Sequence, residues 1–323
     1  MPCPTAWGGG IGLLARRYGY AADQVRRLEL VTADGRLREV TAEFEPDLFW
    51  ALRGGGGNFG VVTGMEIALV PVPRLYGGGL YFDAGPAILD GWLRWTASVP
   101  EEMTSAILLI PFPDIPEVPD PLRGRLVAHI QLAYAGDSDA GETVIAPLRD
   151  LGTCLVDTVR DMAFAESAAV FDDPSDPHSY QGTNIFLREG TGTTETILAQ
   201  TGSELPLIIG LRHLGGALSR PPQEPSAVGH RDARYLLSVL SPADGLDPDL
   251  LGTAHNGVLD AIQPWTTGGF SLNFQFGPAD PTRIPAGYAP GDYQRLLDLK
   301  KQVAPIFLFR GGNTIPATAL GND

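Results

Sequence analysis

One glycine-rich stretch decides how the rest of the sequence is interpreted: Asp47-Leu48-Phe49-Trp50-Ala51-Leu52-Arg53-Gly54-Gly55-Gly56-Gly57-Asn58-Phe59-Gly60-Val61-Val62-Thr63. Pro46 stands directly before it, and a proline at the first turn favours a helix over residues 47–52. The run of four glycines ends that helix, and residues 61–70 are expected to form a strand. Because glycine lacks a side chain, such a turn lets a backbone approach a ligand or another backbone closely.

A second glycine run, Gly8-Gly9-Gly10-Ile11-Gly12, precedes a short helix that Gly19 is expected to close. Glycines before a helix let backbone N–H groups approach a phosphate, although many glycine turns only close a tight corner. Between the two runs, residues 25–32 and 37–40 alternate as strands do. Asp34-Gly35 joins them, which is a signal for a β-hairpin.

Composition bounds the class of protein. The chain has 323 residues, of which 44% are hydrophobic and 19% charged, enough for two ordinary domains. A net charge of -15 repels nucleic acid and anionic lipid, so we expect neither as a partner. Cys3 and Cys154 fit neither a disulfide framework nor a metal site. No apolar run is long enough to span a bilayer, and Met1 does not open a signal peptide, so a cytoplasmic location is expected.

The remaining chain mixes strands and helices, with several strand-like runs that alternate apolar and polar residues. This pattern predicts an α+β fold with an antiparallel sheet that helices cover on one face. Strands are expected at residues 79–82, 106–111, 126–134, 205–213 and 235–240. Helices are expected at residues 87–98, 140–151, 246–263 and 293–303, and a last extended run at 306–310.

The stretch from Arg53 to Thr63, with its spacing from Gly8–Gly12 and from Leu28–Arg36, closely resembles the second half of the FAD-binding domain in berberine-bridge-type FAD-linked oxidases. That family has the vanillyl-alcohol-oxidase fold, also called PCMH-type. Weaker likeness continues at residues 146–149, 211–218 and 230–233, and the likeness returns at residues 293–296 and 313–316. The resemblance implies a partial FAD-binding domain at residues 1–75, a substrate domain at 76–285, and a segment at 286–323 that returns to the first.

The resemblance also implies which residues contact the cofactor. Gly8, Gly9, Gly10 and Gly12 would lie along the flavin cofactor. Asn58, Phe59, Gly60, Val61 and Val62 would line its adenosine end, with Asn313 reaching it from the C-terminal segment. Packing alone would be the other reason for these glycines.

On the substrate side, the resemblance implies a sheet wall that holds a small molecule over the flavin. Alternation along residues 207–214 places Ile208, Gly210, Arg212 and Leu214 on one face and Leu207, Ile209, Leu211 and His213 on the other. Arg212 or His213 could therefore face the cavity. Residues 270–274 resemble the strand that leads back toward the flavin, which adds Asn273 as a substrate contact. Tyr288 and Tyr293 are the remaining catalytic candidates.

Family members carry an earlier subdomain with a phosphate-binding loop and a histidine that tethers the flavin. None of the five histidines of this sequence precedes its glycine runs, and the sequence starts where that subdomain would have ended. Near the end, Phe309, Arg310, Asn313, Ile315 and Pro316 match the family, whereas its aspartate and asparagine before them are replaced. A dinucleotide that loses half of its cradle loses several contacts, so we expect weak FAD binding by this chain alone.

Three functions remain open from the sequence. The chain could be an FAD-linked oxidoreductase that acts on a small specialised metabolite, with the missing subdomain either supplied by another chain or absent because the sequence is truncated at its start. It could be a flavin-independent cyclase that uses the retained pocket, where positioning carries much of the rate. It could also be a non-catalytic partner of a full-length relative.

Overall fold

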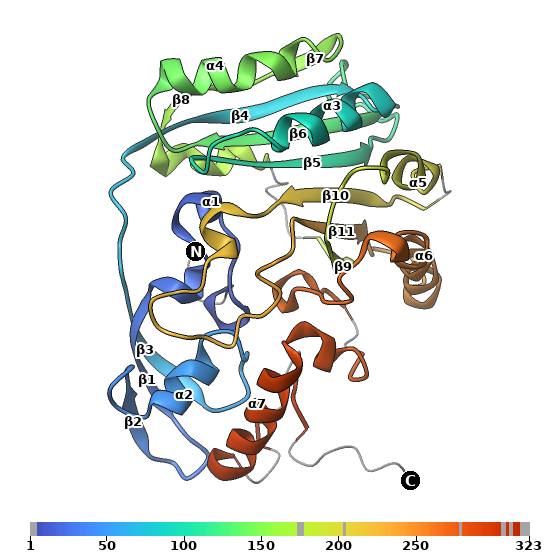
Figure 1. Ribbon diagram of the computed structural model, residues 1–323. Coiled ribbons are helices and arrows are strands. Elements are labelled where there is room, and N and C mark those ends of the chain that lie inside the picture. The colour runs from blue at the N-terminus through green and yellow to red at the C-terminus, as the bar shows by residue number, and fades with distance from the viewer. Residues whose placement is uncertain are drawn as a thin grey trace.

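The computed structural model describes residues 5–172, 178–202, 205–277, 280–304, 308–309 and 313–316. Its described strands form two antiparallel sheets, one small and one large, with helices packed on both (Figure 1). The predicted α+β class is confirmed. Cys3 and most of the run predicted at residues 306–310 lie outside the described residues. No helix in the described part of the chain is long and apolar enough to cross a bilayer.

The N-terminal lobe contains the glycine runs and the small sheet. Its elements, in chain order, are η1 (Thr5–Gly8), α1 (Ala15–Tyr18), η2 (Ala21–Gln24), β1 (Val25–Val31), β2 (Leu37–Val40), α2 (Pro46–Leu52) and β3 (Val61–Ile67). Among the described strands the order is β2-β1-β3, so β3 lies at an edge. Leu28 pairs with Val40 across the predicted hairpin. Gly19, with a φ of 84°, ends the helix that follows the first glycine run, as its position predicted.

Helix α7 (Pro290–Val303) returns from the far end of the sequence and packs against α2 (Figure 1). Leu296 of α7 is fully buried in one cluster with Leu48 and Phe59 of the N-terminal lobe. On the outside of this contact, the guanidinium of Arg295 lies 3.9 Å from the ring centroid of Trp50. The N-terminal lobe and the C-terminal helix therefore share one hydrophobic core.

The large sheet is built from β4 (Arg74–Asp83), β5 (Met103–Pro111), β6 (Leu126–Tyr134), β7 (Cys154–Asp157), β8 (Arg160–Ala163), β9 (Tyr180–Leu187), β10 (Ile208–His213) and β11 (Tyr235–Pro242). Its order among the described strands is β7-β4-β6-β5-β10-β11-β9, and β8 also pairs with β4. All of these pairs are antiparallel. The predicted β6 has the observed bounds, and β5, β10 and β11 differ from prediction by a few residues.

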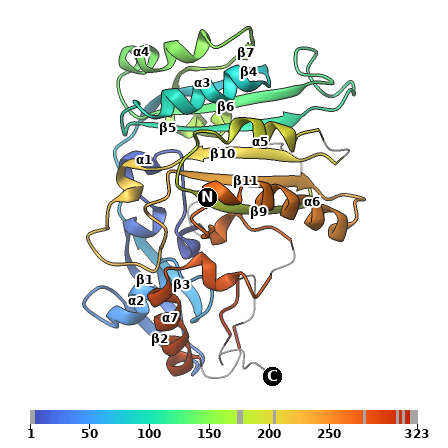
Figure 2. The same ribbon diagram turned by 45° about the vertical axis from the view of Figure 1, so that its right-hand side comes forward.

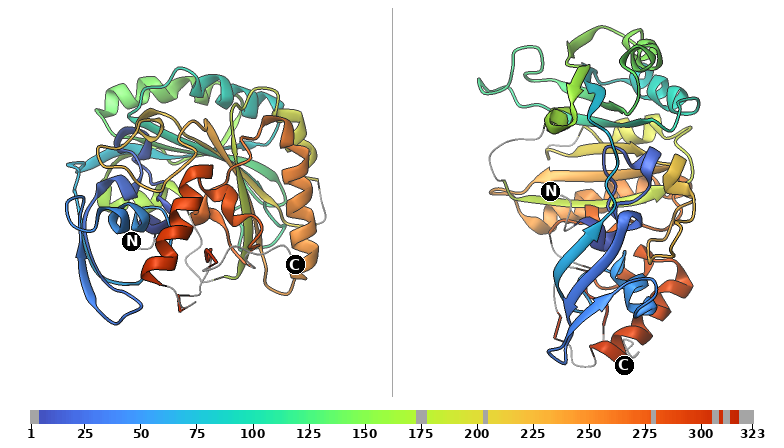
Figure 3. Two further views of the ribbon diagram at one scale, coloured as in Figure 1. Left: turned by 60° about the horizontal axis from the view of Figure 1, so that its bottom comes forward. Right: turned by 90° about the vertical axis from the view of Figure 1, so that its left-hand side faces the viewer.

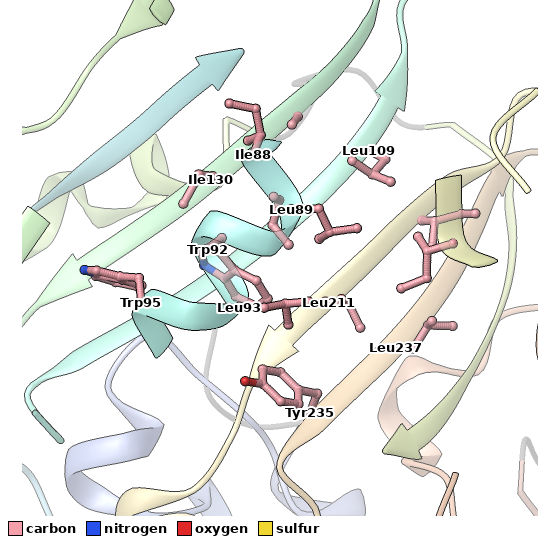
Figure 4. Packing of buried hydrophobic residues seen from close by; sticks show 14 of the residues in the cluster. Ile88, Leu89, Trp92, Leu93, Trp95, Leu109, Ile130, Leu211, Tyr235 and Leu237 are labelled. Atoms are coloured by element: carbon pink, nitrogen blue, oxygen red, sulfur yellow. The ribbon is translucent and has the colours of Figure 1, made fainter. Parts of the chain in front are cut away.

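Four helices cover one face of this sheet: α3 (Pro86–Thr96), α4 (Ser138–Arg149), α5 (Thr194–Ala199) and α6 (Pro248–Ala261) (Figures 2 and 3). Trp92 of α3 is completely buried against the sheet, with its ring centroid 5.9 Å from that of Tyr235 (Figure 4). Burying a side chain of this kind stabilises the fold by roughly 1.5–3 kcal/mol. Because side chains alternate along a strand, the residues next to those that contact the helices point to the opposite face of the sheet, which these four helices do not cover.

Residues 270–274 do not form the expected strand. They turn through η6 (Leu272–Phe274) instead, because a side chain takes the place of a strand partner. Asn184 of β9 donates from Nδ2 to the Ser271 carbonyl at 2.9 Å and accepts from the Ser271 N–H at 2.7 Å. His230 lies in a turn, with a φ of 56°, and strand β11 begins at Tyr235 as predicted.

Candidate functional site

A pocket of about 340 Å³ lies along the edge strand β3, and we call it the glycine pocket. The turn after α2 and the strand itself form its wall, and its lining residues are Trp7, Leu52, Gly56, Gly57, Gly60, Val62, Thr63, Gly64 and Met65. Two residues predicted to line the cofactor, Gly60 and Val62, are among them. Strand β3, which contributes several of these residues, has no second strand partner among the described residues.

The glycines of this lobe fall into two groups. A side chain on Gly60 would stand 2.7 Å from the Val31 carbonyl oxygen, and one on Gly55 would stand 2.9 Å from Leu296 Cδ2. Packing alone therefore requires glycine at these positions. Gly12 and Gly57 differ, because no atom of the described residues lies within 4 Å of the space a side chain would take and their φ angles are not left-handed. Nothing described in the chain itself requires glycine at Gly12 or Gly57.

Asn58 braces the glycine turn from inside. Its Oδ1 accepts from Lys300 Nζ at 2.9 Å and from the Ile315 N–H at 2.8 Å, and its Nδ2 donates to the Gly55 carbonyl at 2.7 Å. Lys300 is completely buried, and burial lowers the pKa of its ammonium to about 8. The protein itself thus occupies the amide of Asn58, and the Asn58 side chain ties the C-terminal segment to the pocket wall.

The other predicted cofactor contacts lie around this brace. Gly8 packs over the side chain of Asn273, which leaves no room for a side chain on Gly8. Gly9 and Gly10 have left-handed φ angles of 106° and 77°. Phe59 is buried in the shared core, Val61 is exposed beside the pocket, and Asn313 donates to the Leu272 carbonyl at 3.1 Å.

A second pocket, of about 490 Å³, lies on the uncovered face of the large sheet, and we call it the sheet pocket. Its floor comes from β4, β5, β6, β10 and β11, and its walls from the loop after β5 and the end of η3 (Phe164–Val170). The described residues that line it are Tyr81, Leu108, Ile110, Phe112, Pro119, Leu122, His129, Phe171, Asp172, Tyr180, Ile208 and Leu240. Most are apolar, as is usual for a site that binds a small organic molecule.

Arg212 and His213 lie on opposite faces of β10, as alternation predicted. Arg212 shares the uncovered face with Ile208 of the sheet pocket. Its guanidinium lies 5.9 Å from the ring centroid of Phe171 and 5.3 Å from that of Phe274. His213 points to the helix-covered face, where its Nε2 accepts from Arg16 Nη1 at 2.5 Å. Burial lowers the pKa of His213 to about 2, so the imidazole beside the Arg16 cation stays neutral.

Three polar residues of the sheet pocket were not predicted from the sequence. The rings of Tyr81 and His129 stack with their centroids 4.0 Å apart and their planes 9° from parallel. The Tyr81 hydroxyl donates to Asp172 Oδ2 at 3.0 Å. Burial lowers the pKa of His129 to about 4 and raises the pKa of Tyr81, so both rings are neutral near pH 7. Alternation of side chains along β6 places His129 on the uncovered face. This alternation was the one feature of the sequence that could have indicated His129 as a pocket residue.

A chain of contacts connects the two pockets. Trp7 lines the glycine pocket, and its neighbour Gly8 packs on Asn273. The next residue, Phe274, lies against Arg212, and Arg212 lies against Phe171 in the wall of the sheet pocket. The predicted substrate contacts Asn273 and Arg212 therefore both lie between the glycine turns and the uncovered face of the sheet.

Tyr288 and Tyr293 lie apart from both pockets. Tyr288 is 2% exposed in the core shared by the N-terminal lobe and α7, and its ring centroid lies 5.9 Å from that of Tyr293. The Tyr288 hydroxyl is buried without a hydrogen-bond partner among the described residues. Neither tyrosine is among the residues that line the glycine pocket or the sheet pocket.

Comparison of the sequence with known proteins finds relatives among FAD-linked oxidoreductases. No protein-family profile matches the chain. It is 28% identical to (R)-6-hydroxynicotine oxidase of Paenarthrobacter nicotinovorans, over 95% of this chain and 69% of that protein. It is 31% identical to berberine bridge enzyme-like C-1 of Nicotiana tabacum, over 51% of this chain and 31% of that protein. Three curated relatives are matched over 54% to 69% of their own lengths.

Solved structures agree on the fold. The crystal structure of 6-hydroxy-D-nicotine oxidase from Arthrobacter nicotinovorans superposes with a TM-score of 0.82 at 21% identity, over 98% of this chain and 71% of that one. The relatives by sequence and the neighbours by structure are FAD-linked oxidoreductases of one kind. That kind is the berberine-bridge-type FAD-linked oxidoreductases, whose PCMH-type fold this chain shares.

Proposed function

We propose that this chain is the larger part of an FAD-dependent oxidoreductase that oxidises a small specialised metabolite. The nucleotide end of FAD would lie in the glycine pocket, and the substrate would lie in the sheet pocket. One observation carries the proposal: the backbone at Gly12 and Gly57 faces open space although nothing described in the protein requires glycine there. A bound cofactor that approaches the backbone closely is a physical reason for both glycines.

The residues that line the glycine pocket fit one face of FAD. The glycine turn offers backbone to an extended ligand without interfering side chains, and the contacts from Trp7 to Arg212 lead from it toward the sheet. FAD, when bound, would supply the acceptor for the electrons removed from the substrate. The protein would exclude water from the substrate through the apolar walls of the sheet pocket and orient it there.

The glycine pocket provides only one wall of an FAD site, so a second wall is needed to enclose the cofactor. The glycine pocket lies along an edge strand and has a wall from one lobe only. We propose that the rest of the flavin cradle comes from residues outside this sequence, either on a longer form of the chain or on a separate partner chain. The cofactor affinity of the 323-residue chain should then be modest.

The experiment is to mix FAD with an excess of the purified chain, follow the flavin fluorescence, and record the visible spectrum of the mixture. Quenched flavin that bleaches anaerobically on addition of one member of a metabolite panel supports the proposal. Flavin fluorescence that an excess of the chain does not quench overturns it. Turnover of a panel member without flavin would favour the flavin-independent cyclase instead.

A further inference from the structure

The loop between β5 and β6, residues 112–125, contributes one wall of the sheet pocket. We propose that this loop is the end wall that limits the length of the substrate, and that Leu122 is the residue that sets the limit. The role rests on the proposed function, in which the sheet pocket holds the substrate. It concerns the end of the substrate that lies away from the flavin and does not react.

Strand β5 relates the loop to the glycine turns. At its start the strand lies next to α1, the helix after the first glycine run, and Arg16 of α1 donates to the Val99 carbonyl at 3.4 Å. At its other end, after Pro111, the chain enters the loop. The nine residues of the strand span roughly 30 Å. Because the pocket residues Leu108 and Ile110 lie in the half nearer the loop, the loop closes the pocket at the end opposite the glycine turns.

Leu122 lies between the loop and the floor of the pocket, which it also lines. Its side chain is 6% exposed and belongs to one buried cluster with Tyr81 of β4 and Val127 of β6. Phe112, at the start of the loop, packs against the same cluster and lines the pocket as well. A change in the size of residue 122 therefore changes the room at this end of the pocket and leaves the glycine turns untouched.

The loop holds its own shape. Arg123 donates from Nε and Nη2 to the Val118 carbonyl, at 3.2 and 3.0 Å, and its Nη2 lies 2.8 Å from Asp120 Oδ1. At the base, the Phe112 N–H donates to the Arg125 carbonyl at 2.9 Å. Four residues of the loop are prolines, which restrict its backbone further. The loop is therefore a preformed wall, and a ligand that is too long meets it as a barrier.

A wall of this kind gives a limit that can be measured. Each methylene group of an apolar ligand that leaves water for the pocket raises the affinity about fourfold. The gain ends when the ligand reaches the wall, because a packed wall resists an added methylene and a longer tail must stay in water.

The test measures binding to the chain without FAD, by calorimetry, with phenyl-substituted alcohols whose tails have one to six carbons, from benzyl alcohol to 6-phenylhexanol. Affinity for the parent chain should rise with tail length up to one length, the cut-off, and rise no further. Leu122→Ala should move the cut-off to a tail longer by about two carbons, since it empties space at the wall. Leu122→Phe should move it to a shorter tail. A loss of stability would weaken every probe in both variants and would not shift the cut-off in opposite directions.

The matched control is Ile115→Ala in the same loop. Ile115 is 43% exposed and is not among the residues that line the pocket, so this variant should keep the cut-off of the parent chain. A parent chain without a cut-off, a cut-off that neither change at Leu122 moves, or one that Ile115→Ala moves as far as Leu122→Ala does, overturns the inference. The two proposals fail separately: a cut-off that follows residue 122 without FAD binding sinks only the oxidoreductase proposal, and FAD binding without such a cut-off sinks only this one.

Discussion

Gly57 and Gly60 lie three residues apart on the wall of the glycine pocket, yet the described protein atoms require glycine only at Gly60. A side chain on Gly60 would meet the Val31 carbonyl and Leu30 Cδ1, whereas one on Gly57 would meet no atom of the described chain within 4 Å. Two residues of one motif therefore have separable roles. Gly60 serves the packing of β3 on β1, whereas no such contact of the described residues requires glycine at Gly57.

The first prediction uses this difference. Gly60→Val should lower the free energy of unfolding by about 1–3 kcal/mol, because the added methyl groups overpack the contact with β1. Gly57→Val should change it by less than about 0.5 kcal/mol, since the new side chain projects into open space. Urea unfolding followed by circular dichroism measures both. Equal losses in the two variants would show that Gly57 is also a packing residue.

The second prediction concerns the brace between the C-terminal segment and the glycine turn. Lys300 Nζ donates to Asn58 Oδ1 at 2.9 Å and to the Ile315 carbonyl at 2.5 Å inside the core. Lys300→Met should lower the free energy of unfolding by about 1–3 kcal/mol, because two buried acceptors lose a charged donor.

The neighbouring residue provides the control for that change. Lys301 is half-exposed and pairs with Asp298 at 3.1 Å, an arrangement worth at most about 1 kcal/mol. Lys301→Met should therefore leave the urea midpoint nearly unchanged. If Lys300→Met were as mild as Lys301→Met, the brace would contribute little to stability.

The third prediction concerns mild acid. His129 and His213 are buried, and burial lowers their pKa values to about 4 and about 2. The unfolded chain binds a proton at each imidazole below a pH of about 6.5, whereas the folded chain does not until those lower values. Lowering the pH from about 6.5 to about 4 therefore favours unfolding, by about 1.4 kcal/mol per pH unit for each histidine.

Urea unfolding at a series of pH values measures this slope. In His129→Leu, which cannot titrate, the free energy of unfolding should fall less steeply with acid, by about 1.4 kcal/mol per pH unit. The comparison depends on the slope, so a constant loss from the substitution does not affect it. Parallel curves for the variant and the parent chain would contradict the buried, neutral state of His129.

Much of the fold was predictable because local patterns and tertiary packing agree there. Pro46 begins α2, the Asp34-Gly35 turn joins β1 to β2, and the alternation along β10 places Arg212 and His213 on the correct faces. Strand β9 was missed because it carries the polar residues Gln181, Thr183 and Asn184. Asn184 is completely buried through its bonds to Ser271, a long-range contact that no local pattern indicates.

The candidate site was predictable only in part. The glycine motif located one wall of the cofactor site, but the sequence cannot distinguish a glycine required by packing from one that faces open space. Tyr81, His129 and Asp172 come from three separate segments and meet only through the pairing of β4 with β6 and the placement of η3 over both. Proximity of this kind depends on register, which composition and spacing do not reveal.

The most direct test of the central claim is a titration of FAD into the chain, followed by quenching of flavin fluorescence, for the parent chain and for Gly57→Val. We expect saturable binding to the parent chain, and at least tenfold weaker binding to Gly57→Val at unchanged stability. Equal affinity in the two proteins, or no saturable binding to the parent chain, would contradict the claim that the glycine pocket holds the nucleotide end of FAD.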